Sequence, residues 1–286
     1  MAFEYMWQLL DKELTLYSII LVMVFIALIY GSISDILTRE LSDVLTYGMI
    51  IAGLMLRLIF SVAESDWSFI LAGLLGLGVC FAIGSGLYYS RVWGGGDAKL
   101  LIGLGAIFGM ELSVNTFMLS FMVNMLIAGA IYGLAYAAWL YFNNQDRISI
   151  FETKGQANML FISVLLLLGI FTITAPAWMK MSAVVLLGIV LVLLLTRLVK
   201  KVEDVCMTKR TRVSELKEGD WLKDDIYADG KYICGKKDLG IDAEQIQAME
   251  KAKIKSVKIK LGIPYVPVFM VGFMLTLAFG NWYGVF

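Results

Sequence analysis

Histidine is absent from this sequence, and charged residues are scarce. None of the 286 residues is His, and Asp, Glu, Lys and Arg together make up only 17%. The absence of His excludes a Ser-His-Asp triad, a Cys-His pair and any His-ligated zinc or haem. Acid–base chemistry in this chain must therefore rest on carboxylates, Lys, Ser, Tyr or Cys.

Cysteine is also rare. Cys80, Cys206 and Cys234 lie far apart in the sequence, so there is no C-x-x-C motif for a metal or a redox disulfide. Cys80 lies in an apolar run and is predicted to be a core residue. We expect no metal site and no cofactor.

Hydrophobic residues, by contrast, make up 59% of the chain, and the mean hydropathy is +0.78. These values exclude a disordered chain, a disulfide scaffold and an ordinary cytosolic enzyme. A helix needs about 20 apolar residues to cross a bilayer. Runs of that kind predict an all-α polytopic membrane protein of about eight membrane helices, one of them short, over residues 14–34, 44–63, 67–90, 100–110, 112–145, 155–179, 181–196 and 261–286. The second run qualifies if Arg57 snorkels toward one face.

A polar insert precedes the last apolar run. Residues 200–260 hold 15 bases and 12 acids, more than half of all charges in the chain. Asp242 precedes a helical pattern, the alternation around Val257 predicts a strand, and residues 213–222 resemble a hairpin. We expect a membrane core in residues 1–199, a small α+β domain in 200–261 and a final transmembrane helix in 262–286. A slight positive charge would suit an anionic membrane surface, but a solvated linker domain is the simpler interpretation.

Lys and Arg are distributed unequally between the two sides of the predicted spans. With the N-terminus outside, the cytoplasmic ends hold eight bases: Arg39, Arg91, Lys99, Arg147, Lys154, Arg197, Lys200 and Lys201. The outer ends hold three: Lys12, Arg57 and Lys180. The positive-inside rule therefore predicts this orientation in the plasma membrane, with the insert in the cytoplasm.

Two polar motifs fall on that cytoplasmic side. Asp35 lies near the end of the first span, and Asp43 begins the second; both have a simple interpretation, as a solvated carboxylate and a helix cap. The second motif is Gly94-Gly95-Gly96-Asp97, followed by a helix of only about 13 residues. Because this helix is too short for a bilayer, we expect the glycines to begin below the membrane surface, where an ionisable residue is a functional candidate. The alternative is an interfacial turn with Asp97 as N-cap.

The two aspartates are more informative when they are considered together. Carboxylates at one membrane depth can share a proton, so that one activates water and the other protonates the leaving group or carbonyl. This chemistry needs no His. The sequence therefore predicts an aspartyl site at Asp35 and Asp97.

These residues resemble the type IV prepilin peptidase family, a branch of the GxGD intramembrane aspartyl proteases. The resemblance rests on Gly94–Asp97 with Lys99, on Asp35 with Leu41-Ser42-Asp43, and on Ile263-Pro264-Tyr265-Val266-Pro267, which is similar to the family's Ile-Pro-Phe-x-Pro motif. It implies that Asp35 and Asp97 are catalytic, that Gly94, Gly95 and Gly96 shape the loop, and that the substrates are leader-bearing filament precursors.

The departures from this family indicate a particular branch. The four-cysteine module and an obvious methyl-donor site of many bacterial members are missing, and Ser42 replaces a common Pro. The chain therefore looks more like archaeal prepilin and preflagellin (prearchaellin) peptidases, which cleave without methylating. We expect these precursors and the lipid bilayer as partners, and no nucleic acid.

Three charged residues near the motifs have two interpretations each. Lys99 could tune a carboxylate or meet an acidic leader residue, or it could be a positive-inside anchor. Arg39 could contact substrate or form a loop ion pair with Glu40. Asp43 could contact substrate or tune a carboxylate, or it could cap its helix. Two rival functions remain: a presenilin-like protease, although Asp35 follows Ser34 rather than Tyr, and a proton-coupled transporter using the aspartate pair.

Overall fold

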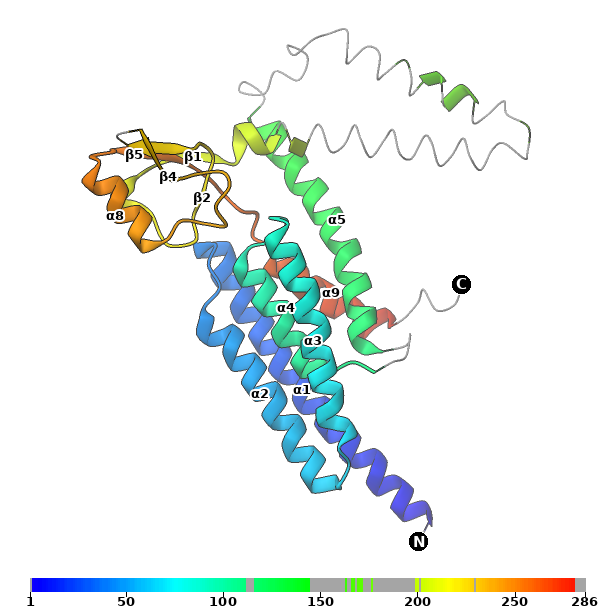
Figure 1. Cartoon of the computed structure of the whole chain (residues 1–286). Coiled ribbons are helices and arrows are strands. Elements are labelled where there is room, and N and C mark those ends of the chain that lie inside the picture. Colours follow the sequence, from blue (N-terminus) through cyan, green and yellow to red (C-terminus); the bar gives the residue numbers. More distant parts are fainter. Residues whose placement is uncertain are drawn as a thin grey trace. The chain divides into compact units, whose positions relative to one another are not determined.

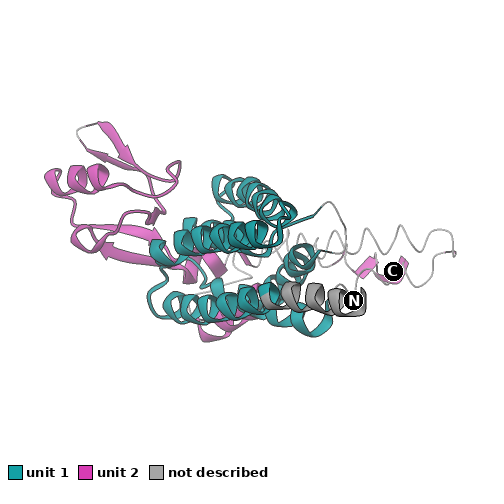
Figure 2. Cartoon of the chain, turned by 90° about the horizontal axis from the view of Figure 1, so that it is seen from below, with its two compact units in different colours: residues 1–132, 262–286 teal, residues 133–261 magenta. Residues whose placement is uncertain are grey.

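A computed structural model describes residues 2–111, 116–144, 199–200, 202–228 and 230–280, together with isolated positions between 163 and 176. Side chains are described from residue 16 onward. The predicted spans at 155–179 and 181–196 lie almost wholly outside the described residues. The chain forms two compact units, Met1–Tyr132 with Gly262–Phe286 and Gly133–Leu261 (Figure 2).

The first unit is helical (Figure 1). Its helices are α1 (Ala2–Thr38), α2 (Asp43–Glu64), α3 (Ser68–Tyr89), α4 (Gly95–Phe108), the first part of α5 (Phe117–Asn143) and α9 (Val266–Phe279). Four helices of the described chain are long and apolar enough to cross a membrane: Leu16–Thr38, Asp43–Glu64, Ser68–Tyr89 and Phe117–Asn143. The structure thus confirms a mostly helical protein with four candidate spans; the total of eight stays a prediction.

Helix α4 is the most buried element of the first unit. It packs against α2 and α3, and nine of its 14 residues are buried. Close approach to α3 depends on small residues, because a Cβ at Gly105 would come within 2.6 Å of the Cys80 sulfur and would also overlap the Gly76 carbonyl. At 1.5 Å per residue, α4 is about 21 Å long. The helix is therefore short, as predicted, but it begins at Gly95 and not after the glycines, so that Gly95 and Gly96 are its first residues.

A buried polar contact joins α5 to α9. The Asn124 side-chain amide donates to Thr276 Oγ1 at 3.1 Å and to the Gly280 carbonyl at 3.3 Å. Both Asn124 and Thr276 are buried. Their hydrogen bond satisfies polar groups that would otherwise be left unpaired among apolar side chains, as helix–helix contacts in membranes commonly do.

The second unit holds a small α+β region. It contains β1 (Thr208–Arg212), the 3-10 turn η2 (Val213–Glu215), β2 (Trp221–Leu222), β3 (Ile226–Ala228), β4 (Lys231–Cys234), α8 (Ala243–Lys251) and β5 (Ser256–Lys260). Strand β5 lies between β1 and β2, antiparallel to both, and β3 pairs with β4. Its core includes Val213, Leu222, Met249 and Val257.

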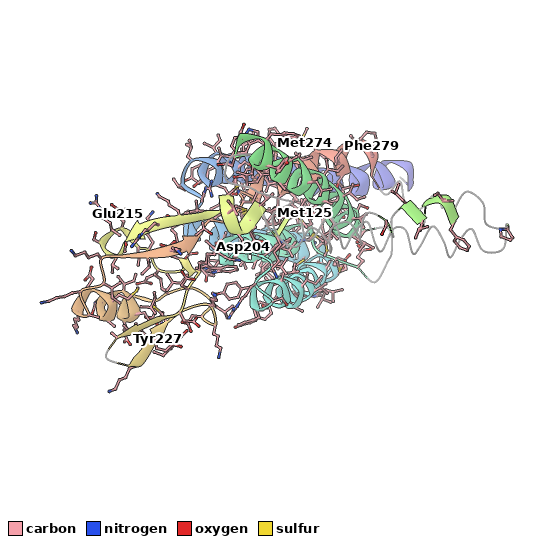
Figure 3. All side chains as sticks on the ribbon, turned by 90° about the horizontal axis from the view of Figure 1, so that it is seen from above. Met125, Asp204, Glu215, Tyr227, Met274 and Phe279 are labelled. Atoms are coloured by element: carbon pink, nitrogen blue, oxygen red, sulfur yellow. The ribbon has the colours of Figure 1, made fainter. Side chains whose placement is uncertain are left out.

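The predicted helix and strand of this region are confirmed, and the hairpin is wrong. Helix α8 begins after Asp242, whose carboxylate accepts from the Gln245 N–H at 2.7 Å in a capping box. Strand β2 pairs with β5 instead of with the residues just before it, so 213–222 is not a hairpin. The hairpin is β3–β4, where the side chain of Tyr227 is exposed on the outer side (Figure 3).

Candidate active site

Asp35 is a buried carboxylate near the C-terminal end of α1. Its side chain is 7% exposed, and its Oδ2 accepts a hydrogen bond from the Val266 backbone N–H at 2.8 Å. The Tyr265 backbone N–H also hydrogen-bonds to it. Val266 is the first residue of α9, where backbone N–H groups lack helical acceptors and carry partial positive charge. The start of α9 therefore holds the first predicted catalytic carboxylate.

Arg39 fixes the turn that follows α1. It has a positive φ of 57° and its N–H closes the last turn on the Asp35 carbonyl at 2.9 Å. Its guanidinium Nη1 donates to the Gly262 carbonyl at 2.8 Å. Arg39 therefore ties the end of α1 to the segment that leads into α9.

Asp97 lies in the first turn of α4. The N-cap of this helix is Gly94, with extended backbone angles, so the alternative of Asp97 as N-cap is wrong. The Asp97 carboxylate is half-buried and hydrogen-bonds to the Gly94 backbone. A Cβ at Gly96 would come within 3.1 Å of the Leu41 Cβ, so the missing side chain lets the first turn of α4 approach the turn after α1.

The structure brings the two predicted catalytic aspartates to the same end of the first unit. The Asp35 and Asp97 carboxylates interact electrostatically, although they come from α1 and α4. Two neighbouring carboxylates resist ionising together and can hold one proton between them. This arrangement can place a base and an acid on opposite sides of a water molecule.

Lys99 and Asp43, predicted as possible tuning or substrate residues, contact each other. Lys99 Nζ lies 2.6 Å from Asp43 Oδ1 and 5.1 Å from the centre of the Tyr47 ring. Asp43 begins α2, after an N-cap Ser42 that makes no side-chain capping bond. The ion pair therefore joins the first turn of α4, which holds Asp97, to the first turn of α2.

Arg57 makes structural contacts that the sequence did not predict. Instead of snorkelling, it is 4% exposed and donates to three backbone carbonyls, those of Phe69 at 3.0 Å, Ile107 at 2.8 Å and Phe108. Two of these carbonyls end α4, where helical donors are missing. A single Arg in an apolar run could have indicated these contacts, because a buried cation requires polar partners.

Cysteine and metal chemistry find no support in the described residues. Cys234 is fully buried, and burial, with a smaller contribution from Asp238 and Asp242, raises the pKa of its thiol to about 11. A thiol with such a pKa is a poor nucleophile near neutral pH. Within the described ranges, no three His, Cys, Asp or Glu side chains are grouped as metal ligands would be.

Comparison with known proteins relates part of this chain to a peptidase family. Residues 21–134 match the model of the type IV leader peptidase family. The chain is 33% identical over 82 residues to a preflagellin peptidase of Methanococcus maripaludis and 37% identical over 82 residues to one of Methanocaldococcus jannaschii. Each match covers 29% of this chain and 35% of the relative.

The similarity to these relatives covers only part of each protein. The chain spans about a third of the length of the curated relatives it matches, and no solved structure matches it. The matched stretch nevertheless runs from within α1 into α5 and includes Asp35, the three glycines and Asp97. The resemblance to the type IV leader peptidase family is therefore confirmed over residues 21–134, the stretch that contains both aspartates.

Proposed function

We propose that this protein is a membrane-embedded aspartyl endopeptidase that removes the leader peptide of prepilin- or preflagellin-like precursors. The observation that carries the proposal is that Asp35 and Asp97, from separate helices, are near enough to interact electrostatically and lie inside the stretch that matches the leader peptidase family. The absence of His from the whole sequence adds support, because it leaves carboxylates as the available acid–base pair.

The proposed reaction is hydrolysis of one peptide bond by water. One carboxylate accepts a proton from water as the water oxygen bonds to the scissile carbonyl carbon, and the other, protonated, carboxyl donates its proton to the carbonyl oxygen. The tetrahedral intermediate then loses the amine, which takes the proton held by the first carboxyl as the C–N bond breaks. A hydroxyl of the intermediate returns its proton to the second carboxylate as the carbonyl re-forms, which restores the starting pair. General acid–base catalysis of this kind contributes about 10²- to 10⁴-fold to the rate.

The two aspartates play different structural parts in this scheme. Asp35 is buried and accepts backbone N–H bonds at the start of α9. Asp97 is half-buried in the first turn of α4, where the preceding glycines leave little side-chain bulk around it. We therefore infer that the substrate backbone approaches along these glycines, next to Asp97.

The distribution of basic residues indicates which side of the membrane the proposed site faces. The basic residues Arg39, Arg91 and Lys99 all lie at the end of the first unit that holds the aspartates, because they flank Asp35 and Asp97 in the sequence. By the positive-inside rule, this end faces the cytoplasm in our proposal. A precursor with a short polar leader before an apolar helix would present its junction there.

Replacement of either aspartate tests the proposed function. We expect Asp35→Asn and Asp97→Asn each to lower cleavage of a co-expressed or purified precursor by at least about 100-fold. Asp66→Asn is the matched control, since Asp66 accepts from the Ser68 N–H in the α2–α3 turn, at the other end of α2 from Asp43. Full cleavage by Asp97→Asn, at equal protein level in the membrane, would exclude the aspartyl mechanism.

A further inference from the structure

Two residues at the end of α1 hold the segment that leads into α9. The Asp35 carboxylate accepts a hydrogen bond from the Val266 N–H at 2.8 Å, and the Arg39 guanidinium donates to the Gly262 carbonyl at 2.8 Å. Asp35 and Arg39 are four positions apart in the sequence, and so are their two partners, in the reverse order. The segment from Gly262 to Val266 therefore runs back along the end of α1 and is hydrogen-bonded to it at both ends.

Proline stiffens the segment between these two hydrogen bonds. The ring of Pro264 fixes its own φ and restricts the backbone of Ile263 before it. Pro267 follows in the first turn of α9, where its fixed φ suits the start of a helix. Few backbone rotations thus remain between Gly262 and Val266, so that holding the Gly262 carbonyl also limits where the Val266 N–H can point.

Packing holds one end of this segment and leaves the other to Arg39. Val266 is buried, and a Cβ at Gly31, one turn before Asp35, would come within 3.2 Å of Val266 Cγ1. Gly262, by contrast, is exposed, and a Cβ there would meet nothing within 4 Å. Gly262 is therefore held by the hydrogen bond from Arg39 rather than by packing.

The backbone of the turn after α1 does not by itself favour an arginine at position 39. The φ of Arg39 is 57°, in the left-handed region that a glycine reaches at lower cost. The turn has its own hydrogen bonds, since Ser34 Oγ donates to the Glu40 carbonyl at 3.0 Å and the Glu40 N–H donates to Thr38 Oγ1 at 3.2 Å. What the arginine adds is a side chain that reaches Gly262, 223 positions away in the sequence.

We propose that Arg39 is a positioning residue for Asp35, whose hydrogen bond to Gly262 holds the segment before α9 so that the Val266 N–H points at the Asp35 carboxylate. This inference rests on the proposed function. A carboxylate that acts on water must keep its orientation, and a displacement of about 1 Å can lower the rate by about 100-fold. In this role Arg39 contacts neither the water nor the scissile bond, and it acts through the backbone that orients Asp35.

Replacement of Arg39 separates positioning from substrate binding. In the purified full-length protein with a precursor peptide, we expect Arg39→Met to lower kcat about tenfold and to leave KM within about twofold of wild type. Arg39→Lys retains a cation that can donate to the Gly262 carbonyl, so kcat should recover to within about threefold of wild type. Because Arg39 is exposed, both variants should unfold close to the wild-type midpoint.

Arg91→Met is the matched control. Arg91 is also exposed and has a φ of 58°, in the turn after α3. We expect this variant to keep the kcat and KM of the wild type. A loss of kcat in Arg91→Met equal to that in Arg39→Met would assign the effect to lost surface charge and overturn the inference.

Hydrogen exchange of the Val266 amide gives a readout that does not depend on cleavage. In Arg39→Met this amide should exchange about tenfold faster than in the wild type, because the segment that carries it is no longer held at Gly262. Unchanged kcat or unchanged exchange in Arg39→Met would overturn the inference, as would a rise in KM at constant kcat, which would make Arg39 a substrate-binding residue. Each of these results leaves the proposed function standing, whereas full activity of Asp97→Asn would overturn the proposed function itself.

Discussion

Charged side chains have different surroundings in the two compact units. In the first unit, Asp35 and Arg57 are buried and bond to backbone groups of other helices. In the second unit, ion pairs such as Arg212–Glu215 and Lys258–Asp224 join exposed side chains. The same residue types thus bond to backbone groups in a buried setting in one unit and pair with one another at the surface in the other. Burial of the partners, rather than the number of charges, decides how much each one matters.

The largest expected effect on stability is at Arg57. Arg57→Met would remove the donor from two buried carbonyls, those of Ile107 and Phe108, and from the part-buried carbonyl of Phe69. Each unsatisfied buried group costs about 1–3 kcal/mol. We expect a loss of about 3 kcal/mol or more in the free energy of unfolding, seen as a lower unfolding midpoint of the detergent-solubilised protein. Arg212→Met, the same change at an exposed side chain, is the control. Equal unfolding midpoints for Arg57→Met and Arg212→Met would show that buried charges of the first unit matter no more to stability than exposed charges of the second.

An intermediate effect is expected for the Lys99–Asp43 pair. Its side chains are 34% and 65% exposed, so solvent screens the attraction despite the 2.6 Å separation. A double-mutant cycle with Lys99→Met and Asp43→Asn should give a coupling free energy of about 0.5 kcal/mol in stability. If Lys99 instead served the substrate, Lys99→Met would raise KM while Asp43→Asn would not.

The smallest effect is expected for the exposed pair of the second unit. Arg212 Nε lies 3.9 Å from Glu215 Oε1, and the side chains are 78% and 55% exposed. The corresponding cycle with Arg212→Ala and Glu215→Ala should give a coupling within about 0.3 kcal/mol of zero. A coupling free energy as large as that of Lys99–Asp43 would show that solvent exposure alone does not determine how much each ion pair contributes to stability.

Local patterns predicted much of the fold of the first unit. Apolar runs placed α2 and α3 within one residue of their ends, and the glycine motif placed the start of the short α4. These features depend on neighbouring residues, which sequence periodicity reports directly. The aspartate pair was predicted for the same reason, since both residues occur at helix ends on one side of the predicted membrane.

The contacts that were missed all join residues far apart in the chain. Arg57 finds its acceptor at Ile107, Arg39 at Gly262, and Asp35 its donor at Val266. No local pattern encodes such partners, and the motif around Tyr265 was recognised without its contact to Asp35. The wrong hairpin has the same cause, because β2 pairs with the distant β5 instead of with its neighbours.

The hydrogen bonds from Arg57 to the end of α4 have a consequence for how these helices insert into the membrane during synthesis. Arg57 leaves the ribosome 50 residues before its acceptor Ile107. During that interval α2 carries a cation with no partner, and an Arg within a membrane helix is costly. Helix α4, at about 21 Å, is in turn too short to insert by its own apolarity. We therefore expect α2, α3 and α4 to insert into the bilayer together, after α4 has been synthesised, rather than one helix at a time.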